Sequence, residues 1–476
     1  MNHPEWTTIV VATGFACLHA VGLLHVFHVL MRGRTAQGTI AWIVCMIVAP
    51  WVAIPFYWIA GRQKFAGYVR ARRAEDAGLR KLSDDMHRRL RQYELQPVDA
   101  FGRAAAQLGG LPFTRGNALH LLIDGDQTFE AIFQSIAAAE HYILVNFFIV
   151  KSDRIGQRFK EALIAKARHG VKVYFLFDEF GSHKLARTYL SELEDAGIEC
   201  RSFGVNRRWW SRLQINFRNH RKIVVTDGHE AFIGGLNVGD EYLGRDQRFG
   251  HWRDTHLRLR GPCVQAIQIV FLEDWNWVAP TRPDLLWDSH EEPANQAAAI
   301  LPTGPADPAD SWQLVVAEAA NSSRERLWIA SPYFVPDQGV LTALQAAAVR
   351  GVDVRILIPE KADHAMVWLA AHTFYDETLP FGIKILRYRA GFLHQKAMLV
   401  DDRYAFIGTA NLDNRSFRLN FELTAVSTDA GFVREVKTML EKDFEEAFSV
   451  TAEHFTGRPL WFRIAARAAR LAAPVL

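Results

Sequence analysis

The side chains best suited to chemistry lie in two copies of one short pattern. Each copy is His-x-Lys followed by an aspartate: His220, Lys222 and Asp227 in the first, and His394, Lys396 and Asp401 in the second. A neutral imidazole can attack phosphorus, and an ammonium two residues away can neutralise phosphate charge. The repeated pattern therefore indicates phosphoryl chemistry, with these six residues as candidate catalytic groups.

The two copies also agree beyond the aspartate. Gly234 and Asn237 follow the first motif, and Gly408 and Asn411 stand at the matching positions after the second. An asparagine amide can donate a hydrogen bond to a non-bridging phosphate oxygen. A single His-x-Lys is more often a solvated strand edge. Two complete copies favour a site in which Asn237 and Asn411 bind substrate phosphate.

Each motif lies in a segment whose pattern predicts β-strands. The apolar runs 221–226 and 397–400 each precede a second run that ends in glycine. Residues two apart on a strand point to the same face, so the histidine and lysine of each copy share one. We expect Asp227 and Asp401 to fix the strand and loop geometry rather than to touch substrate.

The surrounding segments predict an α/β fold that is duplicated. A strand, a helix and a second strand are expected at 142–150, 157–169 and 171–177, and again at 327–334, 339–350 and 352–358. Gly170 and Gly351 mark the same helix-to-strand turn in the two copies. The proline-rich stretch 280–310 indicates a boundary between them.

With these motifs the chain resembles the phospholipase D superfamily and, within it, the bacterial cardiolipin synthases. The segments that carry the resemblance are the two motifs, Gly234-Gly-Leu-Asn237, Gly408-Thr-Ala-Asn411-Leu-Asp-Asn-Arg415-Ser416, Trp252-Arg-Asp-Thr-His256, Ser331-Pro-Tyr-Phe-Val-Pro336 and Asn420-Phe-Glu422. The resemblance implies tandem phospholipase D-like mixed-sheet halves, related by a pseudo-two-fold that brings both motifs to one cleft.

The resemblance also implies roles for single residues. His220 is the expected nucleophile, which forms a phosphohistidine, and His394 the acid and later base, although the reverse assignment stays open. Glu422 matches an orienting glutamate of smaller superfamily members, and we expect Asp254 to be the partner of His220, with a surface salt bridge as the alternative. Where many members carry serine, the first copy has Gly235, whereas Thr409 keeps a hydroxyl for phosphate in the second.

Composition narrows the function classes. The 55 lysines and arginines nearly balance 52 acidic residues, which argues against a general nucleic-acid binder. Cys17, Cys45, Cys200 and Cys263 show no Cys-x-x-Cys spacing, so neither a disulfide framework nor a zinc site is indicated. Because the motif lysines supply positive charge, we expect no metal and no other cofactor.

The amino-terminal part predicts a two-helix transmembrane hairpin. The apolar runs 7–30 and 39–60 each exceed the roughly 20 residues that cross a bilayer, and Pro50 and Pro55 suggest a kink in the second. The three histidines of the first run, at 19, 25 and 28, are expected near an interface or facing the partner helix rather than on a metal. The basic segment after the hairpin places the large domain in the cytoplasm and can touch anionic lipid.

Two further segments have a composition typical of membrane surfaces. One is Arg207-Arg-Trp209-Trp210-Ser-Arg212. The other is the carboxyl-terminal tail, where Leu460, Trp461, Ile464 and Leu471 can share one helical face. For the tail, membrane binding is favoured over a helix docked on the protein or disorder.

The expected divisions are a transmembrane hairpin at 1–61, a basic linker at 62–112, two phospholipase D-like halves at 113–300 and 301–450, and an amphipathic basic tail at 451–476. The expected activity is that of a cardiolipin synthase of the bacterial inner membrane, which transfers a phosphatidyl group from one phosphatidylglycerol to another. Alternatives with the same chemistry are a hydrolytic phospholipase D and a phosphatidyltransferase with another acceptor alcohol. A nuclease is less favoured, because of the hairpin and the balanced charge.

Overall fold

The computed structural model describes residues 4–33, 36–61, 88–96, 99–204, 217–279 and 281–475. The chain divides into two compact units. The amino-terminal unit contains Met1–Phe65 and Val205–Asn216, and the large unit contains Ala66–Gly204 and Phe217–Leu476. The expected membrane-surface loop 207–212 and the basic segment 62–87 lie outside the described residues.

In the amino-terminal unit one long helix packs against a broken one. The elements are α1 (Pro4–Arg32), α2 (Ala36–Val48), α3 (Pro50–Phe56) and the π-helical turn η1 (Tyr57–Gly61). Among the described residues, only α1 is long and apolar enough to cross a membrane. The second apolar run breaks at Ala49, where φ is −141°, because Pro50 has no N–H with which to continue α2. The predicted kink is therefore found at Pro50.

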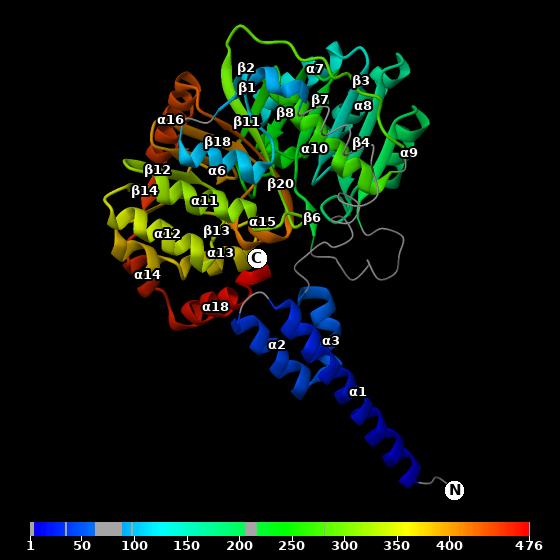
Figure 1. The fold of residues 1–476 in the computed structure, drawn as a ribbon, viewed down its shortest axis with the longest axis vertical. Coiled ribbons are helices and arrows are strands. Elements are labelled where there is room, and N and C mark those ends of the chain that lie inside the picture. The colour runs from blue at the N-terminus through cyan, green and yellow to red at the C-terminus, as the bar shows by residue number, and fades with distance from the viewer. Residues whose placement is uncertain are drawn as a thin grey trace. The chain divides into compact units, whose positions relative to one another are not determined.

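The helices α1, α2 and α3 of this unit pack against one another, as Figure 1 shows. A Cβ at Gly22 would lie 2.5 Å from the carbonyl oxygen of Met46, so glycine lets α1 and α2 approach. The Trp58 indole donates to Nε2 of His25 at 3.0 Å, and the Trp58 ring also stacks on His28. These two histidines face the second helical segment, as the sequence predicted.

The first half of the large unit is a mixed sheet with helices on it. Its strands are β3 (Tyr142–Phe147), β4 (Lys172–Asp178), β5 (Glu199–Phe203), β7 (Ile223–Thr226), β8 (Glu230–Gly234) and β10 (Thr255–Arg260), and its helices are α7 (Asp124–Ala138), α8 (Arg154–Arg168), α9 (Arg187–Asp195) and α10 (Cys263–Val278). The order is β5-β4-β3-β7-β8-β10. The β5–β4 and β4–β3 pairs are parallel and the rest antiparallel.

The second half repeats this order and these directions as β15-β14-β12-β17-β18-β20. Its strands are β12 (Arg326–Ala330), β14 (Asp353–Pro359), β15 (Lys384–Tyr388), β17 (Ala397–Val400), β18 (Tyr404–Gly408) and β20 (Asn420–Ser427). Its helices are α11 (Ser311–Ser322), α12 (Gln338–Val349), α13 (Ala365–His372), α14 (Tyr375–Thr378), α15 (Asn414–Arg418) and α16 (Ala430–Glu445). The predicted tandem duplication of a mixed α/β sheet is confirmed.

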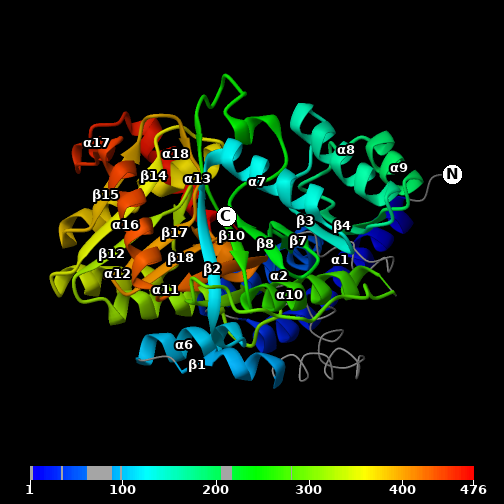
Figure 2. The same ribbon diagram turned by 90° about the horizontal axis from the view of Figure 1, so that it is seen from above.

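Two strands join the halves into one sheet. β2 (Phe113–Ile123) pairs with β10 of the first half, and β11 (Gln296–Thr303) pairs with both β2 and β20. Figure 2 shows β2 running between the two groups of strands. Apolar side chains from the sheet and its helices form a core in each half, with Phe159 and Phe175 in the first and Leu344 and Ile356 in the second.

A second connection between the halves is crosswise. β6 (Arg218–Asn219), just before the first motif, pairs in parallel with β20 of the second half. β16 (Phe392–Leu393), just before the second motif, pairs in parallel with β9 (Trp252–Arg253) of the first half. The amide of His220 donates to the Phe421 carbonyl at 2.9 Å, and that of His394 to the Arg253 carbonyl at 2.8 Å. Each motif histidine is thus fixed by the opposite half.

The remaining described elements are short or peripheral: η2 (Arg91–Tyr93), β1 (Glu94–Leu95), α6 (Ala100–Gly109), η4 (Asp240–Leu243), β13 (Phe334–Val335), η5 (Leu379–Phe381), β19 (Leu412–Asp413), β21 (Ala447–Ser449), α17 (Glu453–Thr456), α18 (Leu460–Leu471) and η6 (Ala473–Val475). The tail therefore forms a helix, α18, which packs against α13.

Candidate active site

The first histidine is held by a carboxylate from the second half. Nδ1 of His220 lies 2.8 Å and 3.1 Å from the two carboxylate oxygens of Glu422, which β20 carries. A carboxylate accepts only, so it fixes the tautomer with the proton on Nδ1. Nε2 is then the ring nitrogen that carries a lone pair for reaction.

The second histidine is held the same way by the first half. Nδ1 of His394 lies 2.8 Å from Oδ2 of Asp254, the residue that follows β9. The expected pairing of Asp254 with His220 is therefore wrong. The partners are exchanged because β9 lies beside β16 and β20 lies beside β6, a pairing between distant strands that sequence spacing does not reveal.

Glu422 is itself held by hydroxyl groups. It accepts from Thr409 at 2.6 Å and from Ser416 at 2.8 Å, and Asn420 lies 3.3 Å away. The Thr409 oxygen also accepts from the backbone N–H of Leu423 at 2.9 Å. The expectation that this hydroxyl contacts phosphate is thus corrected, since its proton is committed to Glu422. Ser416 ends the segment 408–416 that follows the second motif, but no role is predicted for it from the sequence.

Asp254 is supported differently. Its carboxylate accepts from the backbone N–H of Thr255 at 2.8 Å and, at 3.4 Å, from the Trp252 indole. Gly235 occupies the position equivalent to Thr409. A Cβ at Gly235 would lie 1.9 Å from Oδ1 of Asp254, so the carboxylate fills the space that a side chain would take. Glycine here makes room for the acid that orients His394.

The two lysines are buried beside the histidines. Nζ of Lys222 donates to the carbonyl of His220 at 2.7 Å, and Nζ of Lys396 donates to the carbonyl of His394 and lies 3.0 Å from its Nδ1. Burial, together with the charge of the other lysine, lowers the pKa of Lys222 to about 7, and burial lowers that of Lys396 to about 8. An ammonium has three protons, so one bond to a carbonyl leaves donors for phosphate oxygens.

The imidazoles are neutral near pH 7. Burial, with repulsion from the adjacent lysine, lowers the pKa of both His220 and His394 to about 4. Lys396 of the second half also depresses the pKa of His220. Although burial opposes it, His220 and Lys222 hold the pKa of Glu422 below its usual range. The two motifs therefore form one cluster of neutral imidazoles, lysines of lowered pKa and ionised carboxylates.

The motif aspartates fix turns, as predicted. Both adopt a φ of 52°, a left-handed conformation that aspartate tolerates in turns. The Asp227 carboxylate accepts from the backbone N–H groups of residues 140, 141 and 142, and that of Asp401 from those of residues 324, 325 and 326. Each ties the hairpin after its motif to the start of the strand that pairs antiparallel with the motif strand, which is β3 in the first half and β12 in the second.

The motif asparagines differ in their contacts. The Asn237 amide accepts from the backbone N–H of Ile149 at 3.1 Å and donates to the Tyr242 hydroxyl at 3.0 Å. The backbone carbonyl of Asn411 accepts a hydrogen bond from the Trp312 indole at 3.0 Å. Oδ1 of Asn411 is buried and has no hydrogen-bond partner among the described residues.

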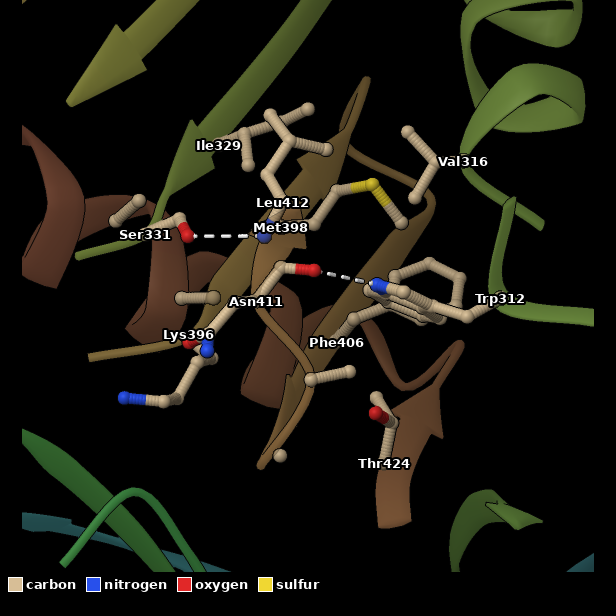
Figure 3. A pocket seen from close by; sticks show the side chains of 14 residues that line it. Trp312, Val316, Ile329, Ser331, Lys396, Met398, Phe406, Asn411, Leu412 and Thr424 are labelled. Carbon is tan, nitrogen blue, oxygen red and sulfur yellow. Dashed lines mark hydrogen bonds between the residues drawn. The ribbon is translucent and has the colours of Figure 1, made fainter. Parts of the chain in front are cut away.

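Figure 3 shows the surroundings of Asn411 and Lys396. The Lys396 ammonium points away from the apolar side chains of Trp312 and Val316, which line a cavity of about 20 Å³. That volume has room for about one water. Ser331 accepts from the backbone N–H of Leu412 at 3.0 Å and fixes the loop after the motif. The apolar packing thus turns the cation toward the histidines.

Two His-Lys pairs held crosswise on duplicated mixed-sheet halves define a phospholipase D-type phosphoryl-transfer enzyme. The family model described as "Cardiolipin synthase, PLD-like domain" matches residues 132–250 and 316–446. The crystal structure of a phosphatidylserine synthase from Haemophilus influenzae Rd KW20 has the same fold, with a TM-score of 0.61 and 16% identity, and the match covers 79% of this chain and 100% of that one.

Similar proteins from Pseudomonas are named cardiolipin synthase A. The protein of Pseudomonas putida (strain W619) is 43% identical over 465 residues, 96% of this chain and 97% of the relative. That of Pseudomonas entomophila (strain L48) is 41% identical over 471 residues, with 96% and 97% covered. The chain therefore belongs to the cardiolipin synthase family and is a phosphatidyltransferase, as the sequence predicted.

Proposed function

We propose that the protein joins two phosphatidylglycerol molecules into cardiolipin and releases glycerol. The observation that carries this proposal is the crosswise pair of histidines, each with Nδ1 on a carboxylate and a lysine beside it. A phosphodiester has a poor alkoxide leaving group, so its exchange needs a nucleophile and a separate proton donor. Two imidazoles on opposite halves can supply both.

In the first step Nε2 of His220 attacks phosphorus of the donor lipid. An N–P bond forms, the P–O bond to glycerol breaks, and His394 gives its proton to the departing glycerol oxygen. The anionic phosphodiester raises the pKa of His394 on binding, so His394 takes up a proton from water as the substrate binds. Lys222 and Lys396, with Asn411 and Asn237 nearby, hold the non-bridging oxygens.

In the second step the terminal hydroxyl of another phosphatidylglycerol gives its proton to His394 and attacks the phosphohistidine. The new P–O bond forms as the N–P bond breaks, which returns His220 to its starting form and releases cardiolipin. Glu422 stabilises the positive charge on the phosphorylated ring, and Asp254 does the same for protonated His394. No metal or other cofactor takes part in either step.

Mass spectrometry of lipids after incubation of the purified full-length protein with phosphatidylglycerol tests this proposal. We expect cardiolipin and an equal amount of glycerol. Phosphatidic acid as the main product would indicate a hydrolytic phospholipase D instead. His220→Ala and His394→Ala are each expected to abolish turnover, and an adduct that forms only in His220→Ala would reverse the roles of the two histidines.

We also propose that the enzyme is a multi-pass protein of the bacterial inner membrane with its large unit in the cytoplasm. α1 has the length of a span, and the apolar α2 and α3 follow as a second, kinked pass. The basic residues of 62–91 favour the cytoplasmic side and anionic lipid. Labelling of single cysteines placed at 33 and 245 in intact cells tests the topology, and equal access to both from outside would contradict it.

A further inference from the structure

The tail helix α18 has one buried face and one exposed apolar face. Phe462, Ala466 and Ala469 are buried, whereas four large apolar side chains are not. These are Leu460, 70% exposed, Trp461, 69%, Ile464, 60%, and Leu471, 84%. A helix that hides one stripe and leaves a second apolar stripe in solvent indicates a further contact of that stripe.

α18 is firmly docked on the second half. The Phe462 ring makes edge contacts with Trp368 and His372 of α13. At the other end, Arg470 pairs with Glu377, and its guanidinium lies 4.3 Å from the centre of the Phe374 ring. The exposed stripe is therefore held in a fixed orientation. Docking on the protein and binding to a membrane are alternatives in the sequence prediction, but α18 docks with one side and leaves the other side open for a second contact.

The position of α18 relates it to the active site. α13, on which it packs, follows the carboxyl end of β14, and Figure 1 shows α13 and α18 side by side. The last turn, η6, packs against α15, the helix that carries Ser416, whose hydroxyl binds Glu422. Met366, in the first turn of α13, is also 51% exposed. The exposed stripe thus lies at the end of the large unit that holds the histidines.

The charge beside the stripe indicates what covers it. Leu460, Ile464, Arg467 and Leu471 succeed one another at helical spacing, so the exposed Arg467 lies within the apolar row. In a protein interface this guanidinium would need a buried acidic partner. At a bilayer surface it can reach lipid phosphates while the apolar side chains enter the acyl boundary and Trp461 lies at head-group depth.

We propose that the exposed face of α18 inserts into the interface of an anionic bilayer and holds the active site at head-group level. This inference rests on the proposed function in that it takes a phospholipid as the substrate. The reacting phosphorus lies at the head group, so a helix anchored at that depth presents the histidines to it without withdrawing the lipid from the bilayer.

Depth-dependent fluorescence quenching in the full-length protein tests the insertion. Ile464→Cys and Val349→Cys are each placed in a chain that carries Cys17→Ala and Cys45→Ala, and labelled with an environment-sensitive dye. Burial raises the pKa of Cys200 and of Cys263 to about 12, so these thiols resist labelling. Val349 is the matched control, since it is 70% exposed but ends α12 just before the start of β14, whereas α13, on which α18 packs, follows the other end of that strand.

In vesicles of phosphatidylglycerol and phosphatidylcholine with nitroxide on the acyl chains, we expect strong quenching at position 464 and little at 349. Equal quenching at both positions would overturn the inference, whether or not cardiolipin is formed. A wild-type protein that makes no cardiolipin would instead refute the proposed function, while the quenching would still decide the role of α18.

A second comparison measures the consequence for turnover. The exposed-face variant Ile464→Glu/Leu471→Glu is expected to lose at least about tenfold in activity on vesicle lipid, because it removes two apolar side chains from the face that would enter the bilayer. Val349→Glu is expected to keep wild-type activity. Thermal stability shows whether the α18 variant is folded. Wild-type activity in the folded variant would contradict the proposal.

Discussion

Replacement of Glu422 by glutamine tests whether His220 and His394 have different roles in the reaction. Glutamine keeps the shape of the side chain, and its amide oxygen can still accept a hydrogen bond from His220. The hydroxyls of Thr409 and Ser416 can rotate, so each can donate to the amide oxygen or accept from the amide NH2 group. What is lost is the negative charge 2.8 Å from Nδ1 of His220. That charge has its largest effect when phosphorylation makes the ring cationic.

The size of the effect follows from the bond that changes. A hydrogen bond to a charged group contributes about 1.5–3 kcal/mol, which corresponds to about 10- to 150-fold in rate. Because Glu422 acts on the nucleophile, the loss should be the same for phosphatidylglycerol and for a p-nitrophenyl phosphodiester. Asp254→Asn is the matched control on His394. It should slow reaction with phosphatidylglycerol by a similar factor but leave the first step with p-nitrophenyl nearly intact, since that leaving group needs no proton.

Stopped-flow measurement of the p-nitrophenol burst, one equivalent per active site, gives the first step alone. We expect a slow burst in Glu422→Gln and a near-normal one in Asp254→Asn. A normal burst in Glu422→Gln together with a slow one in Asp254→Asn would refute the assignment of His220 as nucleophile. Equal slowing in both variants would refute the separation of roles.

Three further results are expected. The pKa of about 4 for His220 and His394 lies below that of an unfolded histidine, so the unfolded chain binds more protons, and the melting temperature should fall as pH is lowered from about 6.5 to 4. Circular dichroism melts check this, and a pH-independent midpoint would contradict the burial argument. Gly235→Ala puts a Cβ 1.9 Å from Oδ1 of Asp254 and should cost about 1–3 kcal/mol of stability and most of the activity, whereas Gly339→Ala, with a nearest contact of 3.3 Å, should cost little. Activity should survive EDTA, and a complete loss restored only by Mg²⁺ or Zn²⁺ would show that the lysines do not replace a metal ion.

Much of the fold could be predicted because its signals are local. The predicted strand 142–150, helix 157–169 and strand 171–177 correspond to β3, α8 and β4, and their counterparts near 327–358 to β12, α12 and β14. Gly170 and Gly351 have φ values of 90° and 92°, which confirms the left-handed turn that glycine predicted at both positions. Periodicity and glycine act within one segment, so the sequence displays them directly.

The orienting pairs could not be predicted, because they depend on which strands meet. The sequence indicates Asp254 and Glu422 as orienting acids, but its pairing of Asp254 with His220 is wrong, because the crosswise strand pairs β6–β20 and β9–β16 join segments that lie far apart in the sequence. The bond from Thr409 to Glu422 was missed for the same reason, since it joins a strand end to its neighbour across the sheet. The expected division points at 112, 300 and 450 stay predictions.

The crosswise strands have a consequence for how such an enzyme can evolve. If the two halves were identical chains in a two-fold dimer, every substitution would enter both positions at once, and the two histidines would keep equal surroundings. A single tandem chain is free of that constraint. The surroundings of the two acids already differ. Glu422 accepts hydrogen bonds from two hydroxyls, whereas Asp254 packs against a glycine and accepts from an indole. The fused chain can therefore specialise one imidazole for attack and the other for proton transfer, while neither half alone contains a complete histidine site.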